Sequence, residues 1–186
     1  SDDHEGIIEL SENFKNGTSA VEALKLDDPI FEIGITPNRG DCLSIRGVAR
    51  DLSAKGMGKL KPLKYEKIKK LEFESPISWN IKNDDNSCEY VVSRYFKDVN
   101  NTKSPEWLQK KLISLGLRPI NALVDITNFI TVDLGRPLHV FDADKVGKKL
   151  DMRLANSNEK ILALDNKDYT LDLNSTVIAD SNNALA

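Results

Sequence analysis

The sequence has little of several features that would point to an obvious function. It has only two cysteines, Cys42 and Cys88, and two histidines, with no CxxC pair or Cys/His cluster of the kind that binds zinc. Two distant cysteines do not make a disulfide framework, so we expect free thiols in a reducing cytosol. No apolar run approaches the ~18 residues of a membrane span, and the start has no secretory pattern. We therefore expect a cytoplasmic chain with no membrane partner.

The charge balance argues against one class of partner. The 186 residues carry a net charge of −3, and the sequence pI is about 5.5. A protein that grips duplex nucleic acid usually has a high pI or a strong basic patch. A large electrostatic footprint on nucleic acid is therefore not supported, while a local contact, or one shared with another chain, stays open.

Familiar catalytic motifs are absent as well. The sequence has no GxGxxG, Walker or GxSxG segment and no clustered metal ligands. We therefore expect no cofactor and no metal bound by this chain. An enzyme built on it would work by holding a substrate and a water molecule in position.

The pattern of apolar residues predicts an α+β fold, with a small helical N-terminal piece followed by a mixed domain with an antiparallel β-sheet and a few helices. We expect an acidic segment and part of a helical domain at residues 1–56, a lysine-rich linker at 57–70 and the mixed domain at 71–186. A polar turn is predicted at 83–87. Strands are predicted at 77–81, 90–96, 150–154, 161–164, 169–171 and 176–179.

A helix is predicted after a proline–glycine turn, with Asp41 as its N-cap and Gly56 as its stop. Gly47 within this helix costs ~1 kcal/mol relative to alanine, which indicates close packing or a backbone contact there. Arg46 and Arg50 lie four residues apart on one face. They form either a solvated face or a contact with an anion or an RNA backbone.

A second helix is predicted to begin with Ser104 as its N-cap and Pro105 at its first position, and to end at Gly116. A short apolar helix is expected at 125–131, in a unit that Gly135 ends. The buried face of the helix that follows Ser104 is expected to consist of Trp107, Leu108, Leu112, Ile113 and Leu115.

The stretch from Ser104 to Asp142 is the most informative part of the chain. Polar residues that fit no simple helix or strand period lie along it, next to apolar anchors and turn-forming prolines and glycines. This pattern indicates a shaped site. The candidate site residues are Arg118, Asn121, Asp125, Asn128 and His139.

Each candidate has a structural alternative. His139 either acts by hydrogen bonding or proton transfer near neutral pH, or is a half-buried side chain whose hydrogen bonds are made within the protein. Asp142 is close enough in sequence to orient it. Pro119 restricts the backbone of Arg118, and its guanidinium suits a phosphate or carboxylate but equally a structural salt bridge. The other three candidates either line a polar pocket or supply helix caps and turn hydrogen bonds.

Three motifs carry a resemblance. The first is TPNRGDCLSIRGVAR at residues 36–50. The second opens as SPEWL at 104–108 and continues through LGLRPIN and VDITN to residue 128, and the third is GRPLHVFD at 135–142. Together with the tail they resemble the beta subunit of bacterial-type phenylalanyl-tRNA synthetase over residues 18–186.

The resemblance implies a fragment of a larger enzyme that attaches phenylalanine to its tRNA with ATP and Mg²⁺. It implies an assembly of two alpha and two beta subunits with the synthetic site on alpha, so the expected partners are the alpha subunit and the 3′ end of tRNA(Phe). It also implies that residues 71–186 belong to an editing domain, which hydrolyses tyrosine wrongly attached to that tRNA.

By the same resemblance, His139 and Arg118 are the expected catalytic residues. His139 would position the water or the terminal adenosine, and Arg118 would meet the tRNA end. Further editing residues of the family would follow residue 186, so the fragment alone is expected to hold an incomplete editing site and no aminoacylation site. The expected substrate-binding residues are Asn121, Asp125, Asn128, Pro137 and Leu138.

Two other functions stay open. The first is a non-catalytic tRNA-binding or subunit-docking module, in which the same residues are structural. The second is a DNA-binding role for residues 36–56, which only the two-arginine helix supports and the low pI opposes.

Overall fold

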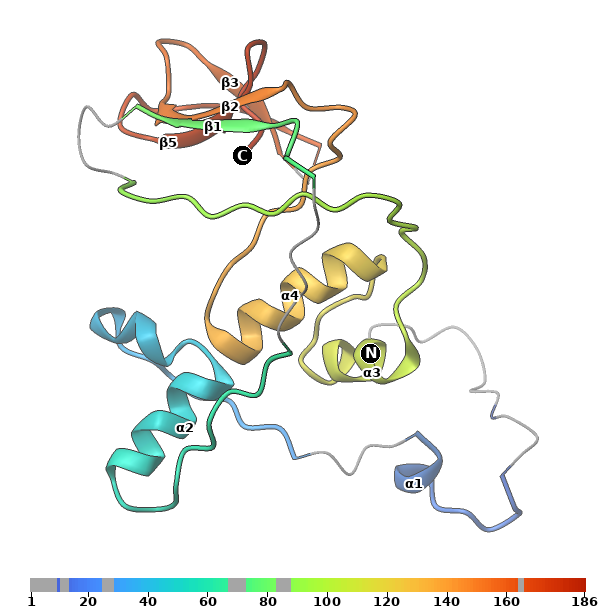
Figure 1. The fold of residues 1–186 in the computed structure, drawn as a ribbon. Helices are drawn as coiled ribbons and strands as arrows, with labels where there is room; N and C mark the ends of the chain where they lie inside the picture. The colour runs from blue at the N-terminus through green and yellow to red at the C-terminus, as the bar shows by residue number, and fades with distance from the viewer. Residues whose placement is uncertain (1–9, 11–13, 25–28, 67–72, 83–87, 164–165) are drawn as a thin grey trace. The chain divides into compact units, whose positions relative to one another are not determined.

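The computed structural model describes residues 10, 14–24, 29–66, 73–82, 88–163 and 166–186. Its helices and strands confirm the predicted α+β class (Figure 1). They fall into two compact units that alternate along the chain: Ser1–Leu60 with Thr102–Leu138, and Lys61–Asn101 with His139–Ala186. The first unit contains the helices and the second contains the strands. The expected domain limits at residues 56 and 71 stay a prediction.

The helical unit contains four α-helices and one 3-10 helix among its described residues. The 3-10 helix η1 precedes α2, and α3 and α4 follow in the second stretch of this unit. The bounds are α1 Ala20–Leu24, η1 Pro37–Cys42, α2 Ile45–Ala54, α3 Glu106–Ser114 and α4 Ala122–Leu134.

Helix α2 starts later than predicted. Its N-cap is Ser44, whose side chain accepts a hydrogen bond from the Gly47 N–H, so the prediction of Asp41 as the cap is wrong. Asp41 lies inside η1, which Pro37 begins. The end is as predicted, since Gly56 follows the C-cap with a φ of +83°, a conformation that glycine adopts without steric cost.

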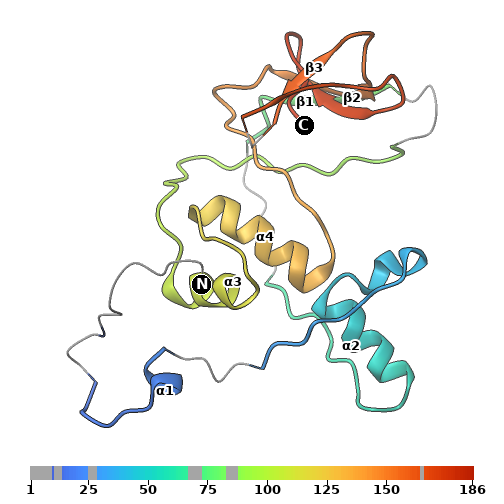
Figure 2. The ribbon, with the colours of Figure 1, turned by 180° about the vertical axis from the view of Figure 1, so that it is seen from behind.

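Helices α3 and α4 lie side by side (Figures 1 and 2). Leu108 and Leu112 are buried on α3, but Trp107 and Ile113 are 55% and 60% exposed, so the predicted buried face was too wide. Trp107 packs edge-on against Phe129 of α4, with ring centroids 5.7 Å apart. Aromatic pairs favour this arrangement because the edge of one ring is positive and the face of the other negative.

The two ends of these helices also differ in part from expectation. Pro105, not Ser104, is the N-cap of α3, and no side chain caps this helix. Helix α4 is longer than the predicted 125–131, because Asn121 caps it before the apolar run begins and Gly135 ends it at a φ of +69°.

The strand unit contains a three-stranded sheet in the order β1-β2-β5 and a two-stranded sheet, β3-β4. Strand β2 pairs in parallel with β1 and antiparallel with β5, so the larger sheet is mixed. Strands β3 and β4 correspond to the predicted strands at 161–164 and 169–171, and they pair antiparallel. The bounds are β1 Ser78–Ile81, β2 Lys149–Leu154, β3 Lys160–Leu162, β4 Asp168–Thr170 and β5 Thr176–Ala179.

The core of this unit is small and is formed around β5, the edge strand of the larger sheet. Val177 and Ala179 of β5 are buried with Ala155 and Ala184. Alternation of apolar and polar residues predicted β1 and β2, whereas β5 was predicted as a short apolar run, and its residues Val177, Ile178 and Ala179 are buried in succession.

One predicted strand is wrong. Residues 90–96 form no strand, and Tyr90, Val92 and Phe96 are exposed. Their β-branched and aromatic composition favours a strand only where a neighbouring strand supplies packing, and no described residue pairs with them. The predicted turn at 83–87 lies outside the described residues. The linker prediction is described only for 57–66, where there is no helix or strand.

No helix in the described part of the chain is both long and apolar enough to cross a membrane.

Candidate functional site

The RPIN segment, residues 118–121, links α3 to α4 and is held at both ends. Before it, Gly116 adopts a φ of +76° and the Leu117 N–H donates to the Leu112 carbonyl at 2.9 Å. After it, the Ala122 N–H donates to the Thr102 carbonyl at 2.8 Å. The segment that carries the first predicted catalytic residue is therefore anchored by backbone hydrogen bonds on either side.

Asp125 lies beneath this segment and is fully buried. Its Oδ1 accepts a hydrogen bond from the Ile120 N–H at 2.8 Å, and its Oδ2 accepts one from the Ser104 hydroxyl. Both carboxyl oxygens are thus bonded within the protein, as a buried polar group requires. Asp125 joins two stretches of chain that are 21 residues apart.

Asn121 is the N-cap of α4 and Asn128 lies within it, both on the same side as Asp125 by helical spacing. The Asn121 side chain accepts from the Val124 N–H at 3.1 Å and caps the helix. Asn128 is half-buried, and its side chain makes no hydrogen bond among the described residues. Asn121 therefore has a structural task already, whereas the amide of Asn128 is open to a ligand.

Arg118 is exposed, and its guanidinium has no ion pair or hydrogen bond among the residues that the structure describes. The alternative of a structural salt bridge therefore finds no support in this part of the chain. A guanidinium on an anchored segment is suited to bind a phosphate or carboxylate, because its planar fork meets two oxygens at once.

His139 is exposed and stacks on Phe141, with ring centroids 5.9 Å apart and planes 11° from parallel. Asp142 does not orient it. The Asp142 carboxylate instead lies 3.5 Å from the Lys145 ammonium and accepts the Asp144 N–H at 3.1 Å. The possibility that Asp142 orients His139 therefore finds no support among the described residues.

The structure brings together some of the predicted site residues and not others. Arg118, Asn121 and Asp125 gather at the start of α4, and Asn128 lies one helical turn further on. Pro137 and Leu138 are exposed at the end of the same helical unit, while His139 begins the second stretch of the strand unit. The two predicted catalytic residues thus belong to different compact units.

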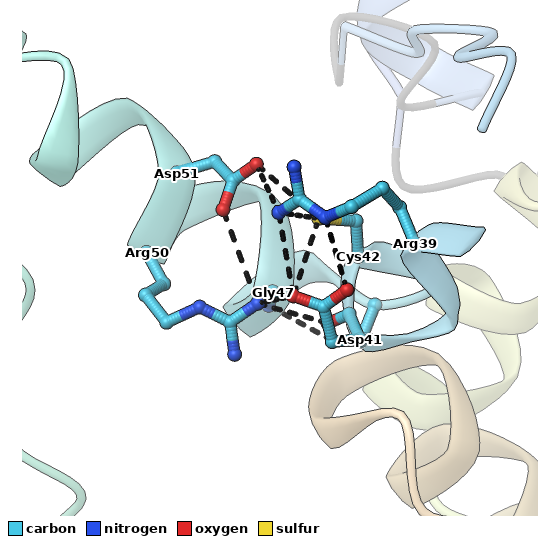
Figure 3. Close-up of polar contacts among 7 residues, drawn as sticks. Arg39, Asp41, Cys42, Gly47, Arg50 and Asp51 are labelled. Carbon is cyan, nitrogen blue, oxygen red and sulfur yellow. Dashed lines mark hydrogen bonds and ion pairs between the residues drawn. The ribbon is translucent and has the colours of Figure 1, made fainter. Parts of the chain in front are cut away.

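A second polar cluster was not foreseen from the sequence. Arg39 donates to Asp41 at 3.1 Å and to Asp51 at 2.6 Å, while Arg50 donates to Asp41 (Figure 3). The thiol of Cys42 donates to Asp51 at 3.3 Å. This ionic cluster ties η1 to α2, and the nearby opposite charges of Arg39, Asp41, Arg50 and Asp51 were the signal that could have revealed it.

The hydrogen bonds in the ionic cluster shift its titrations in the directions expected from charge. Hydrogen bonds from Arg39 lower the pKa of Asp41 and of Asp51, and these carboxylates raise the pKa of Arg39. Burial is the main cause that raises the pKa of the Cys42 thiol, and the hydrogen bond to Asp51 adds to it. The thiol is therefore protonated at neutral pH.

The ionic cluster is poorly suited to a metal ion. One oxygen each from Asp41 and Asp51 and the sulfur of Cys42 lie within 4.8 Å of one another, which resembles a ligand set. However, Arg39 donates to all three of these residues, and metal ligands must be free and deprotonated. Arg50 also pairs with Asp41 within the chain while its side chain stays 48% exposed, which agrees with a solvated face.

A shallow apolar hollow lies next to the ionic cluster. Large apolar side chains close to the lining residues in the sequence are exposed, including Ile30, Phe31 and Leu43. An exposed apolar patch of this kind commonly marks an interaction surface. The hollow is lined by Ile33, Ile35, Cys42, Val48, Asp51 and Leu52.

Comparison with known proteins identifies the second half of the chain. The B3/4 domain family matches residues 87–186, a stretch that includes the RPIN segment, α4 and His139.

Whole-chain comparison extends the similarity to the first motif. The chain is 52% identical over 184 residues to the phenylalanine–tRNA ligase beta subunit of Brucella abortus, 49% over 182 residues to that of Mesorhizobium japonicum and 48% over 184 residues to that of Paramagnetospirillum magneticum. Each match covers 97–98% of this chain but only 22–23% of the relative. The expected resemblance is confirmed, and the chain belongs to the B3/4 domain family.

Proposed function

We propose that the chain is part of the beta subunit of a phenylalanine–tRNA ligase and contributes to an editing site that hydrolyses tyrosine wrongly attached to tRNA(Phe). The observation that carries the proposal is the exposed guanidinium of Arg118 on an anchored segment, with the amide of Asn128 on the neighbouring helix, because neither side chain has a partner among the described residues. Similarity to ligase beta subunits over nearly the whole chain supports it.

Editing has a physical reason in this reaction. Phenylalanine and tyrosine differ by one hydroxyl, and an apolar pocket rejects an added hydroxyl by only about a hundredfold in comparable cases. A second site that recognises the hydroxyl removes the error after it has been made. The chain would supply part of that second site.

The chemical step is hydrolysis of an ester. Water adds to the tyrosyl carbonyl carbon, the bond from that carbon to the ribose oxygen of the terminal adenosine breaks, and the ribose oxygen takes a proton. Tyrosine leaves as the free acid. Arg118 would bind the tRNA end through a phosphate, and His139 would hold the water or the adenosine.

The proposal implies partners and cofactors outside this chain. The complete ligase would contain an alpha subunit, in an assembly of two alpha and two beta subunits in the cytoplasm, and would use ATP and Mg²⁺ for synthesis. Among the described residues, the ionic cluster is the acidic group that most resembles a magnesium site. Its carboxylates are already paired with Arg39 and Arg50. These residues do not fit Mg²⁺, and no editing step is routed through a metal.

The decisive experiment compares deacylation of Tyr-tRNA(Phe) by the complete ligase with His139→Ala and Arg118→Ala variants. We expect a loss of roughly a hundredfold for His139→Ala, because a misplaced water costs about that much, and of about tenfold or more for Arg118→Ala. Phenylalanine attachment should be unchanged. Lys111→Ala, which removes an exposed cation from α3, is the matched control.

Unchanged deacylation in both variants would remove the editing assignment. Weaker tRNA binding with unchanged hydrolysis would instead favour the non-catalytic module. One observation supports that second candidate, namely the apolar hollow and the exposed side chains of Ile30 and Phe31, which suit a docking surface.

A further inference from the structure

Asp125 is a buried acidic residue whose position packing alone does not explain. Its side chain has no exposed surface, and no described lysine or arginine pairs with it. An apolar residue would fill the same space without the desolvation cost of a carboxyl group. The carboxyl group is instead bonded at both oxygens, to the Ser104 hydroxyl and to the Ile120 N–H.

These two hydrogen bonds act on the segment that carries Arg118. Ile120 lies two residues after Arg118, with the rigid Pro119 between them. Fixing the Ile120 N–H therefore fixes the direction in which the chain leaves Arg118. Ser104 holds the other oxygen from the stretch before α3, where the Ser104 carbonyl also accepts a hydrogen bond from the Gln109 side chain.

We propose that Asp125 is a positioning residue, which with Ser104 holds the RPIN segment so that Arg118 is presented to its anionic ligand in one orientation. This inference rests on the proposed function for the identity of that ligand, the tRNA end. Because Asp125 is buried, it acts through the segment and not by touching the substrate. A pre-ordered guanidinium loses less conformational freedom on binding, which raises affinity without a new contact.

The first test measures the segment itself and needs no substrate. Amide hydrogen exchange at Ile120 in this chain should accelerate about tenfold or more in Asp125→Ala, because the Ile120 N–H loses its acceptor. Exchange should also accelerate in Ser104→Ala, because the Asp125 carboxyl group then loses the hydroxyl that holds it in place. Asp125→Asn should exchange nearly as slowly as the unaltered chain, since its amide oxygen accepts from Ile120. Asp133→Ala, on the same helix and with no described partner, is the control.

The second test is a cycle in the complete ligase with Arg118→Ala, Asp125→Ala and the double variant, read as deacylation of Tyr-tRNA(Phe). Asp125→Ala should lower kcat/KM about tenfold or more, and the double variant should be no worse than Arg118→Ala, because Asp125 acts only through Arg118. Asp125→Asn should restore most of the rate. Ser104→Ala replaces Asp125→Ala if the latter does not fold.

The outcomes separate the two proposals. Additive losses, or unchanged Ile120 exchange in both Asp125→Ala and Ser104→Ala, would overturn the positioning role. Accelerated exchange together with an Arg118→Ala variant that still deacylates normally would keep the structural link but overturn the editing function of Arg118.

Discussion

The α-carbon of Gly47 faces the carbonyl oxygen of Asp41 so closely that a β-carbon on Gly47 would lie 2.1 Å from it and 2.9 Å from the α-carbon of Cys42. Both neighbours are backbone atoms, which cannot rotate away. The glycine thus allows η1 to fold back against the first turn of α2. This contact explains a glycine in the first turn of the helix, and it confirms the close packing predicted for that position.

Gly47→Ala should therefore destabilise the chain, although alanine is the better helix former. We expect a loss of about 1–3 kcal/mol in the free energy of unfolding, the usual cost of overpacking. Urea unfolding followed by circular dichroism measures it. Gly58→Ala, where an added β-carbon meets nothing within 4 Å, should change stability little. Equal effects in both variants would contradict the contact.

The pair of Arg153 and Glu159 should make stability depend on pH. Two hydrogen bonds of 2.7 Å join them, and both side chains are largely buried. The bonds from Arg153 lower the pKa of Glu159 from 4.5 to about 2. Because the folded pKa is depressed, the stabilisation is fully present above pH 4.5 and is lost as the pH falls toward 2.

In the unaltered chain the Glu159 carboxylate also accepts a hydrogen bond from the Asn156 N–H. Glu159→Gln removes the negative charge but keeps an oxygen that can accept this hydrogen bond. We expect this variant to be about 1–3 kcal/mol less stable at pH 7 and nearly equal to the unaltered chain at pH 2. The difference between their unfolding free energies across this range isolates Glu159 from the other carboxylates. A difference that does not change with pH would rule out the ionic contribution.

The two cysteines should react at different rates with a thiol reagent. Cys42 is buried, and its raised pKa disfavours the reactive thiolate. Cys88 is only partly buried. With a coloured disulfide reagent at pH 8, we expect one fast thiol that Cys88→Ser abolishes and Cys42→Ser preserves. The reverse assignment would mean that the region around η1 opens readily in solution.

Asn121 offers a way to separate capping from ligand binding. Asn121→Ala should cost about 1 kcal/mol, the typical value of an N-cap, whereas Asn121→Ser should retain most of the stability because serine also caps helices. Thermal unfolding tests this. If Asn121→Ser is stable but slows Tyr-tRNA(Phe) deacylation in the complete ligase, its predicted substrate-binding role gains support. Equal stability of Asn121→Ala and the unaltered chain would show that the cap is dispensable.

The sequence by itself was sufficient for features whose cause is local. Alternation and short runs of apolar residues predicted the paired strands, and Gly56 and Gly135 predicted the ends of α2 and α4, because glycine adopts the left-handed backbone conformation without steric cost. The motifs were sufficient for the family as well, since the similarity to ligase beta subunits runs along nearly the whole chain.

Only the tertiary structure decided the features that depend on a distant partner. Ser104 was expected to cap its own helix, but its hydroxyl binds Asp125, and Asp41 was expected to begin α2 but bonds Arg39 and Arg50 instead. Residues 90–96 have the composition of a strand but no described partner. Local propensity determines which backbone conformations of a short segment are low in energy. The choice among side-chain hydrogen bonds of similar strength depends on which groups the packing brings together.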